Sequence, residues 1–302
     1  MLAAGSGASC RECAGARLMN PAGYSFRIWS VEARGGGEST SRQLRGASGS
    51  ARAERRGLSR CVRGDRDNEL ALLLENDALF LHIPKTAGMW VSRVLRDLGL
   101  VRCRVATKHA DMERVLHCAR YLPGRYVQAV VKAGPRWQRR VRRSFKFCFV
   151  RHPLAWYESY WLFMQSRGWN RWGVDRRGRP RWHPNARLDG LGSEDFNVFM
   201  RAVLEAQPGY VGTLYGWYAT DQIDFVGKQE QVTEDLVAVL AQLGVTFDEP
   251  RVRAASAVNV SPDPEGRPRW DPGLLRETLR AERAALERFG YTEERERRAA
   301  RS

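Results

Sequence analysis

The segment Leu79-Phe-Leu-His-Ile-Pro-Lys-Thr-Ala-Gly-Met-Trp90 decides the fold, because an apolar run leads through a turn into a helix-like pattern. Residues 78–83 are predicted to form a buried strand, and residues 89–98 a helix with one apolar face. A strand, a turn and a helix in succession are typical of parallel α/β sheets. In such a sheet the turn lies at the carboxyl edge of the strand, where ligands usually bind.

The same alternation continues along the chain. Further helices and strands are expected in seven segments: helices at 111–121, 153–165, 233–243 and 271–289, and strands at 126–131, 145–150 and 223–226. Strands that alternate with helices predict an α/β fold with a mostly parallel central sheet flanked by helices.

Composition limits the chemistry. The 302 residues include 43% hydrophobic residues, enough for a core, and the formal net charge of +16 favours anionic partners. Nucleic acid, an acidic membrane face, a nucleotide and an anionic polymer all fit that charge. No run of about eighteen apolar residues and no apolar leader is found, so neither a transmembrane helix nor a secretory signal is expected.

The six cysteines are sparse and irregularly spaced, which favours a reducing compartment and a cytoplasmic location. Cys10 and Cys13 have the spacing of a metal-binding pair. No second pair follows at zinc-finger distance, so a chance pair is preferred to a metal site.

Three regions are expected. Residues 1–68 hold eleven of the 28 glycines and no sustained periodicity, which predicts a disordered tail. An organelle leader, or translation upstream of the true start, would fit the same composition. Residues 69–295 are expected to form the folded domain, and residues 296–302 a charged tail.

The turn His82-Ile-Pro-Lys-Thr-Ala-Gly88 has the parts of an anion cradle. The following helix would direct its free N–H groups at a bound anion. Lys85 adds a cation, Thr86 adds a hydroxyl donor, and Gly88 lets the backbone approach closely. The Walker A pattern is absent, and these features alone fit an ordinary strand-to-helix connection equally well.

The segment His82–Gly88 resembles the 5′-phosphosulfate loop of sulfotransferases that use 3′-phosphoadenylyl sulfate (PAPS), particularly those related to carbohydrate sulfotransferases. A second motif of that family binds the 3′-phosphate and reads as a strand, then Arg-x-Pro, then Ser eight residues after the Arg. The segment Phe147–Ser159 is similar, with Arg151 and Ser159 at the two expected positions.

The resemblance implies a P-loop-like three-layer sandwich and PAPS as the sulfuryl donor, with no metal required. It assigns Lys85 to the 5′-phosphate, together with Thr86 and the N–H groups of Ala87, Gly88, Met89 and Trp90. Arg151 and Ser159 would hold the 3′-phosphate. The acceptor would be a hydroxyl or amine compound, with a carbohydrate or small metabolite preferred. The product, adenosine 3′,5′-bisphosphate (PAP), would share the site.

Transfer also needs a base for the acceptor proton. His109 is the candidate, because it lies shortly after the first strand–helix unit, where related enzymes place a catalytic His. A structural role for His109 remains open. His82 is expected to pack, His152 to fill the undemanding middle position of Arg-x-Pro, and Glu158 is the second choice of base.

Two basic segments could extend the site. Residues 136–146 carry six Arg and Lys side chains, and residues 167–184 interleave Trp with Arg. The first is either a solvated helix face or loop, or a rim that attracts anions. The second is a long loop whose Trp rings either stack on a ligand or pin the loop to the core. The rival function is a non-catalytic polyanion-binding or nucleic-acid-binding protein, although nucleic acid is the less favoured partner.

Overall fold

The computed structural model describes residues 71–106, 109–117, 135–175, 177–256 and 268–291, together with two short strands. These strands, β1 (Arg17–Met19) and β2 (Ser25–Arg27), pair antiparallel with each other. Contacts divide the chain into two units, residues 1–54 and residues 55–302. Three predictions lie outside the described residues: the strand at 126–131, the tail at 296–302 and, apart from β1 and β2, the disorder over 1–68.

A five-stranded mixed sheet forms the centre of the larger unit. Its strands are β3 (Ala71–Leu74), β4 (Leu79–Leu81), β5 (Val101–Val105), β6 (Lys146–Val150) and β7 (Phe225–Lys228). The spatial order is β5-β3-β4-β6-β7. The pairings β4–β6 and β6–β7 are parallel, whereas β3 pairs antiparallel with both β4 and β5.

The α/β class is therefore confirmed, but the sheet is only partly parallel, because two of its strand pairings are parallel and two are antiparallel. The departure comes from β3 and β5, neither of which was predicted. Ala71–Leu74 is a four-residue apolar run, too short for its period to separate strand from helix. Val101–Val105 alternates with two arginines and is only partly buried at the edge of the sheet.

Several helices match their predicted ranges closely. They are α2 (Gly88–Asp97), α6 (Pro153–Gln165) and α9 (Val232–Gln242). The helix predicted at 111–121 begins as α3 (Met112–Leu116). The helix predicted at 271–289 is two helices, α11 (Pro272–Ala281) and α12 (Arg283–Arg288), because the chain turns at the buried Glu282.

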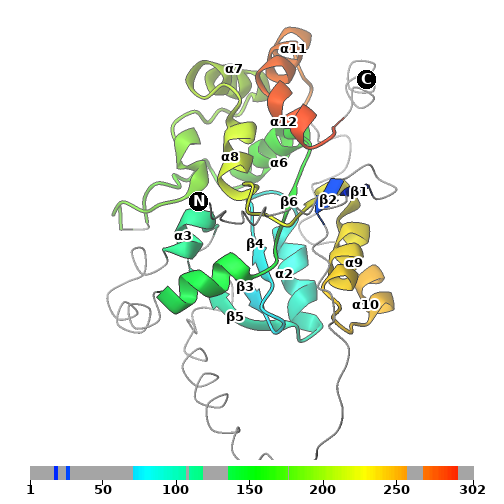
Figure 1. Cartoon of the computed structure of the whole chain (residues 1–302). Helices are drawn as coiled ribbons and strands as arrows, with labels where there is room; N and C mark the ends of the chain where they lie inside the picture. The colour runs from blue at the N-terminus through cyan, green and yellow to red at the C-terminus, as the bar shows by residue number, and fades with distance from the viewer. Residues whose placement is uncertain are drawn as a thin grey trace, which may run out of the picture. The chain divides into compact units, whose positions relative to one another are not determined.

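Other helices were not predicted. They are α7 (Phe196–Ala206), α8 (Tyr210–Tyr218), α10 (Glu249–Arg253), and the 3₁₀ helices η1 (Pro184–Leu188) and η2 (Gln229–Gln231). Residues 135–143 also form a helix, one of the alternatives left open for that basic segment. Figure 1 shows α6, α7, α8, α11 and α12 gathered above the sheet, with α9 and α10 to its right. No helix among the described residues is both long enough and apolar enough to cross a membrane.

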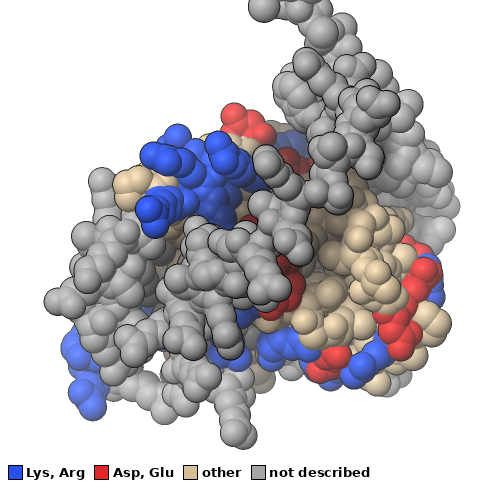
Figure 2. Space-filling model, turned by 60° about the horizontal axis from the view of Figure 1, so that its bottom comes forward, with Lys and Arg blue, Asp and Glu red and all other residues tan. Residues whose placement is uncertain are grey.

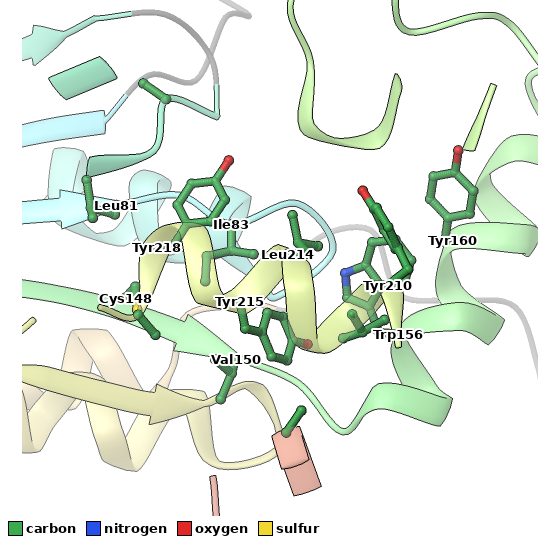
Figure 3. Close-up of a cluster of buried hydrophobic side chains, with 14 of the residues drawn as sticks. Leu81, Ile83, Cys148, Val150, Trp156, Tyr160, Tyr210, Leu214, Tyr215 and Tyr218 are labelled. Atoms are coloured by element: carbon green, nitrogen blue, oxygen red, sulfur yellow. The ribbon is translucent and has the colours of Figure 1, made fainter. Parts of the chain in front are cut away.

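The core lies where α8 packs against the parallel strands. Leu214, Tyr215 and Tyr218 of α8 are completely buried. They join a cluster with side chains from β4, β6 and the segment after β4 (Figure 3): Leu81, Ile83, Cys148 and Val150. Burial of rings and branched chains of this size contributes roughly 1.5–3 kcal/mol each. This packing holds α8 against the strand ends that carry the candidate site.

Candidate functional site

The loop between β4 and α2, residues 82–88, has a tightly defined backbone. Lys85 and Ala87 adopt positive φ angles of 66° and 61°, which non-glycine residues rarely do. Thr86 Oγ1 donates to the Ile83 carbonyl at 3.0 Å, and its side chain is buried. Trp156 Nε1, from α6, donates to the Pro84 carbonyl at 2.8 Å. The surrounding contacts thus hold the loop in a conformation that costs energy, as functional loops often do.

Position 88 needs a glycine because the side chain of His82 packs against it. A Cβ atom added at Gly88 would lie 1.8 Å from His82 Cδ2, so the imidazole of His82 occupies the space of any side chain. His82 is itself buried and stacks on Phe80 with ring centroids 6.3 Å apart. The expected packing role of His82 is therefore confirmed, and its ring brings the start of α2 close to the end of β4.

The N-terminus of α2 starts at this loop. Ala87 is the N-cap residue, and the N–H of Val91 is bonded to the Ala87 carbonyl at 3.1 Å. The preceding N–H groups of Gly88, Met89 and Trp90 belong to the first turn, where no acidic side chain is present to neutralise the helix dipole. Trp90 is anchored through Nε1 to the Ala255 carbonyl at 3.3 Å. The helix therefore presents a positive end beside Lys85.

Lys85 is half-buried, and its surroundings lower the pKa of its ammonium group. Burial, followed by the charges of Arg151 and Arg167, lowers the pKa of Lys85 to about 7. Its Nζ lies 4.2 Å from the centroid of the Phe163 ring, a cation–π contact that favours the charged form. The ammonium group is thus crowded by positive charge, an arrangement that an anion would relieve.

Arg151 follows β6 directly, at the same edge of the sheet as the loop after β4. Its Nη1 lies 3.5 Å from the carbonyl oxygen of Lys85. The backbone of Arg151 is bonded to a single side chain: its N–H donates to Tyr215 Oη at 3.0 Å, and its carbonyl accepts from the same hydroxyl at 2.7 Å. The structure therefore brings together the two predicted motifs.

Ser159, the other predicted phosphate ligand, lies in the second turn of α6. Its side chain is buried, with 7% of its surface exposed. The helix starts at Pro153, directly after the Arg151–His152 turn, so Ser159 is carried by the same element as that turn.

His109 contacts His82, the first residue of the loop between β4 and α2. Its Nδ1 lies 3.2 Å from the carbonyl oxygen of His82. A carbonyl only accepts hydrogen bonds, so this contact requires the proton on Nδ1. The ring also meets the rings of His82 and His183 edge-on, at 4.7 and 5.0 Å. His109 is buried, with 6% of its surface exposed.

The second choice of base, Glu158, is engaged elsewhere, because its Oε1 accepts from Trp270 Nε1 at 2.8 Å. The backbone N–H of His152 donates to Glu230 Oε1 at 2.9 Å, and its ring meets Tyr291 edge-on at 5.1 Å. Glu230 follows β7 just as Arg151 follows β6, so the rule that ligands bind at strand ends could have identified it.

Sequence reasoning missed other residues around the site. Phe163, Tyr215 and Tyr218 contact Lys85, Arg151 and His109 respectively. The run Tyr210-Val-Gly-Thr-Leu-Tyr-Gly-Trp-Tyr218 is visibly aromatic. Its composition indicates burial, but the loop that each hydroxyl reaches depends on tertiary packing.

The Trp-containing loop is pinned to the core, one of the two alternatives expected from its sequence. Trp172 stacks on His183 at 4.1 Å, nearly parallel, and on Phe163 at 6.1 Å. Trp169 packs so closely that a Cβ atom on Gly192 would meet its ring at 2.4 Å. These rings form a continuous stack from Phe163, which contacts Lys85, to His183, which contacts His109.

The basic helix of residues 135–143 lies at the other edge of the sheet, because it leads into the amino end of β6. Its exposed basic side chains are Arg136, Arg139, Arg142 and Arg143. Arg140 pairs with Asp77, in the turn before β4, which confirms that placement. Figure 2 shows Lys and Arg side chains crowded on one part of a face whose other parts carry both signs of charge. Of the two alternatives for this segment, the solvated helix face agrees with this placement and the rim around the site does not.

Comparisons with family models, with curated proteins and with solved structures found no match. Within the part of the chain that the structure describes, no group of three or more His, Cys, Asp or Glu side chains is arranged to hold a metal ion. The candidate site thus rests on the geometry of Lys85, Arg151, His109 and the start of α2.

Proposed function

We propose that this chain is a sulfotransferase that moves a sulfuryl group from PAPS to a hydroxyl or amine of an acceptor, with a carbohydrate or small metabolite preferred. The observation that carries the proposal is the approach of Arg151 Nη1 to the Lys85 carbonyl at 3.5 Å. It joins two motifs 66 residues apart in the sequence at the ends of neighbouring parallel strands. The strand β4, its loop and α2 would form the P-loop-like part of the fold.

The donor would bind through its two phosphate groups. The 5′-phosphosulfate would lie at the start of α2, where Lys85 and the N–H groups of Ala87, Gly88, Met89 and Trp90 balance its charge. Thr86 would shape the loop, since its hydroxyl is bonded to Ile83. Arg151 and Ser159 would hold the 3′-phosphate. A dianion between Lys85 and Arg151 would also offset the burial and the positive charges that lower the Lys85 pKa.

The chemistry would be an in-line displacement at sulfur. The acceptor oxygen or nitrogen forms a bond to sulfur as the bond from sulfur to the phosphate oxygen breaks. The electron pair of the broken bond stays on the phosphate of PAP, beside Lys85 and the start of α2. The acceptor proton passes to Nε2 of His109, because Nδ1 is committed to the His82 carbonyl.

Calorimetric titration with PAP tests the proposal. The wild-type chain is expected to bind PAP with a micromolar Kd. Arg151→Ala should weaken binding by roughly ten- to a hundred-fold, the value of a charge-assisted contact of about 1.5–3 kcal/mol. Arg139→Ala is the matched control, because it removes the same charge from the opposite edge of the sheet and should leave the Kd within about two-fold.

A folded wild-type chain that does not bind PAP would overturn the enzyme proposal. The alternative, a polyanion-binding protein with a degenerate nucleotide loop, is favoured by the net charge of +16 and the exposed basic helix of residues 135–143. That function predicts binding to anionic polymers that weakens steeply with salt and does not depend on Arg151.

A further inference from the structure

Three buried tyrosines on α8 direct their hydroxyl groups to three different segments of the chain (Figure 3). Tyr215 bonds to both backbone groups of Arg151, and Tyr218 donates to the His109 carbonyl. Tyr210 Oη lies 3.0 Å from the Pro184 carbonyl and 3.1 Å from Asn185 Oδ1, away from both motifs. The short helix α8 thus contacts both the segment that contains Arg151 and the segment that contains His109.

We propose that α8 is a positioning helix, in which Tyr215 orients Arg151 for the 3′-phosphate and Tyr218 orients His109 for proton transfer. Neither tyrosine touches substrate, so both are positioning residues. The inference rests on the proposed function for the roles of Arg151 and His109. The hydroxyl contacts themselves are features of the free protein.

The contact to Arg151 is unusually restrictive. Arg151 is the first residue after β6, where the regular ladder no longer defines the direction of the peptide groups. One hydroxyl accepts from its N–H at 3.0 Å and donates to its carbonyl at 2.7 Å, so the peptide groups on both sides are held. The two peptide groups fix the direction in which the Arg151 side chain leaves the backbone. Losing the hydroxyl would loosen the backbone of Arg151 without changing the Arg151 side chain itself.

The contact to His109 acts in the same way. His109 has a φ of 58°, a conformation that a residue with a side chain adopts only when its surroundings impose it. Tyr218 holds its carbonyl and the His82 carbonyl holds its Nδ1, so the backbone and the ring are each held. Together these bonds direct Nε2 and select one tautomer.

The helix itself is firmly placed. Glu282 Oε1 and Oε2 accept from the N–H groups of Val211 and Gly212, at 2.9 and 2.7 Å, at the start of α8. The rings of Tyr215 and Tyr218 are completely buried. Burial raises the pKa of both phenols well above the ordinary value, so both hydroxyls stay protonated and able to donate at any pH near neutrality.

The experiment compares Tyr215→Phe, Tyr218→Phe and Tyr210→Phe, each of which removes one oxygen from α8 and keeps the ring. Tyr210→Phe is the matched control for the loss of a buried hydroxyl. Titration with PAP is expected to give a roughly ten-fold weaker Kd for Tyr215→Phe, equivalent to about 1.4 kcal/mol. Tyr218→Phe and Tyr210→Phe should stay within about two-fold of the wild type.

The second measurement concerns His109 and needs no acceptor. Proton–nitrogen spectra of the labelled imidazoles, assigned with a His109→Gln variant, should show a single Nδ1–H tautomer for His109 in the wild type. Tyr218→Phe should convert it to an average of two tautomers, whereas Tyr215→Phe and Tyr210→Phe should not.

Equal PAP affinities for the three variants, or an unchanged His109 tautomer in Tyr218→Phe, would overturn the positioning role while leaving the proposed function intact. A wild type that fails to bind PAP would instead remove the proposed function, and the positioning role with it. If Tyr215→Phe does not fold, the Tyr218→Phe spectrum decides the inference.

Discussion

Lys85 is the residue whose chemistry is most altered by its position. Its pKa of about 7 means that near neutrality a large fraction of the molecules carry an uncharged amine. A bound phosphate dianion stabilises the ammonium form and raises the pKa, so binding between pH 7 and the raised value takes up a proton. The loss of affinity with rising pH therefore begins near 7, well below the ordinary pKa of 10.5.

We accordingly expect the Kd for PAP to rise by up to about tenfold per pH unit above 7, because one proton is gained per ligand bound. Titrations at pH 8 in buffers of different ionisation enthalpy should report this uptake. Lys85→Gln should bind more weakly and without uptake. A wild type whose affinity is constant from pH 6.5 to 9 would contradict the shifted pKa.

Gly88 is expected to be intolerant of even a methyl group, because a Cβ atom there would overlap the His82 ring at 1.8 Å. Gly88→Ala must displace His82 or the start of α2. It should lower the free energy of unfolding by roughly 1–3 kcal/mol, as overpacking does, and should also weaken PAP binding.

Gly216→Ala in α8 is the control, because no atom outside its own helix backbone and chain neighbours lies within 4 Å of a Cβ there. It should leave PAP binding unchanged and should stabilise the helix by up to about 1 kcal/mol. Urea denaturation of both variants measures the difference. A Gly88→Ala chain as stable as the wild type would contradict the close packing of His82.

Among the elements, α2, α6 and α9 were predictable because each carries its own signals. Pro153 begins α6, and Glu234 and Asp235 lie in the first turn of α9. Most of α8 had no such signal, since its residues are apolar and aromatic on all sides and Gly212 and Gly216 interrupt them. Sequence motifs identified Lys85 and Arg151. They did not identify Tyr215 and Tyr218 of α8, because the contacts of these tyrosines with Arg151 and His109 join residues 64 or more positions apart.

Glu282 tests the attachment of α8. Its buried carboxylate accepts from Val211, Gly212 and the hydroxyl of Tyr157, the last at 2.6 Å. Glu282→Gln would place an amide NH₂ against one of these donors. We expect a loss of roughly 1–3 kcal/mol in the free energy of unfolding, the cost of leaving buried donors unsatisfied.

The exposed Glu287, which pairs with Arg283 on α12, provides the control. Glu287→Gln should leave the free energy of unfolding almost unchanged, as expected for an exposed surface ion pair. Chemical denaturation separates the two variants, and equal midpoints would show that the Glu282 carboxylate does not anchor α8.

Over the whole molecule, positive charge and the candidate site are separated. Lys85 and Arg151 lie at the carboxyl edge of the parallel strands, and the helix of residues 135–143 lies at the amino edge. Replacing Arg136, Arg139, Arg142 and Arg143 by Gln lowers the formal charge by four. Such a chain should elute from a heparin column at lower salt, because fewer counterions are displaced.

The same variant should bind PAP within about two-fold of the wild type at 150 mM salt, where the screening length is about 8 Å. A comparable loss of PAP affinity and of heparin retention would mean that the two functions share a surface. That result would favour the polyanion-binding alternative.

The order of strands in the sheet has a consequence for how the chain folds. Strands β3, β4 and β5 come from the continuous segment 71–105, whereas β6 and β7 join from residues 146–150 and 225–228. Contacts between neighbours in the sequence form sooner than contacts that close long loops. We expect a kinetic intermediate in which the Lys85 loop exists before Arg151 arrives. PAP added during refolding would then accelerate only the last phase, and the nascent chain would gain a complete site only after β6 docks beside β4.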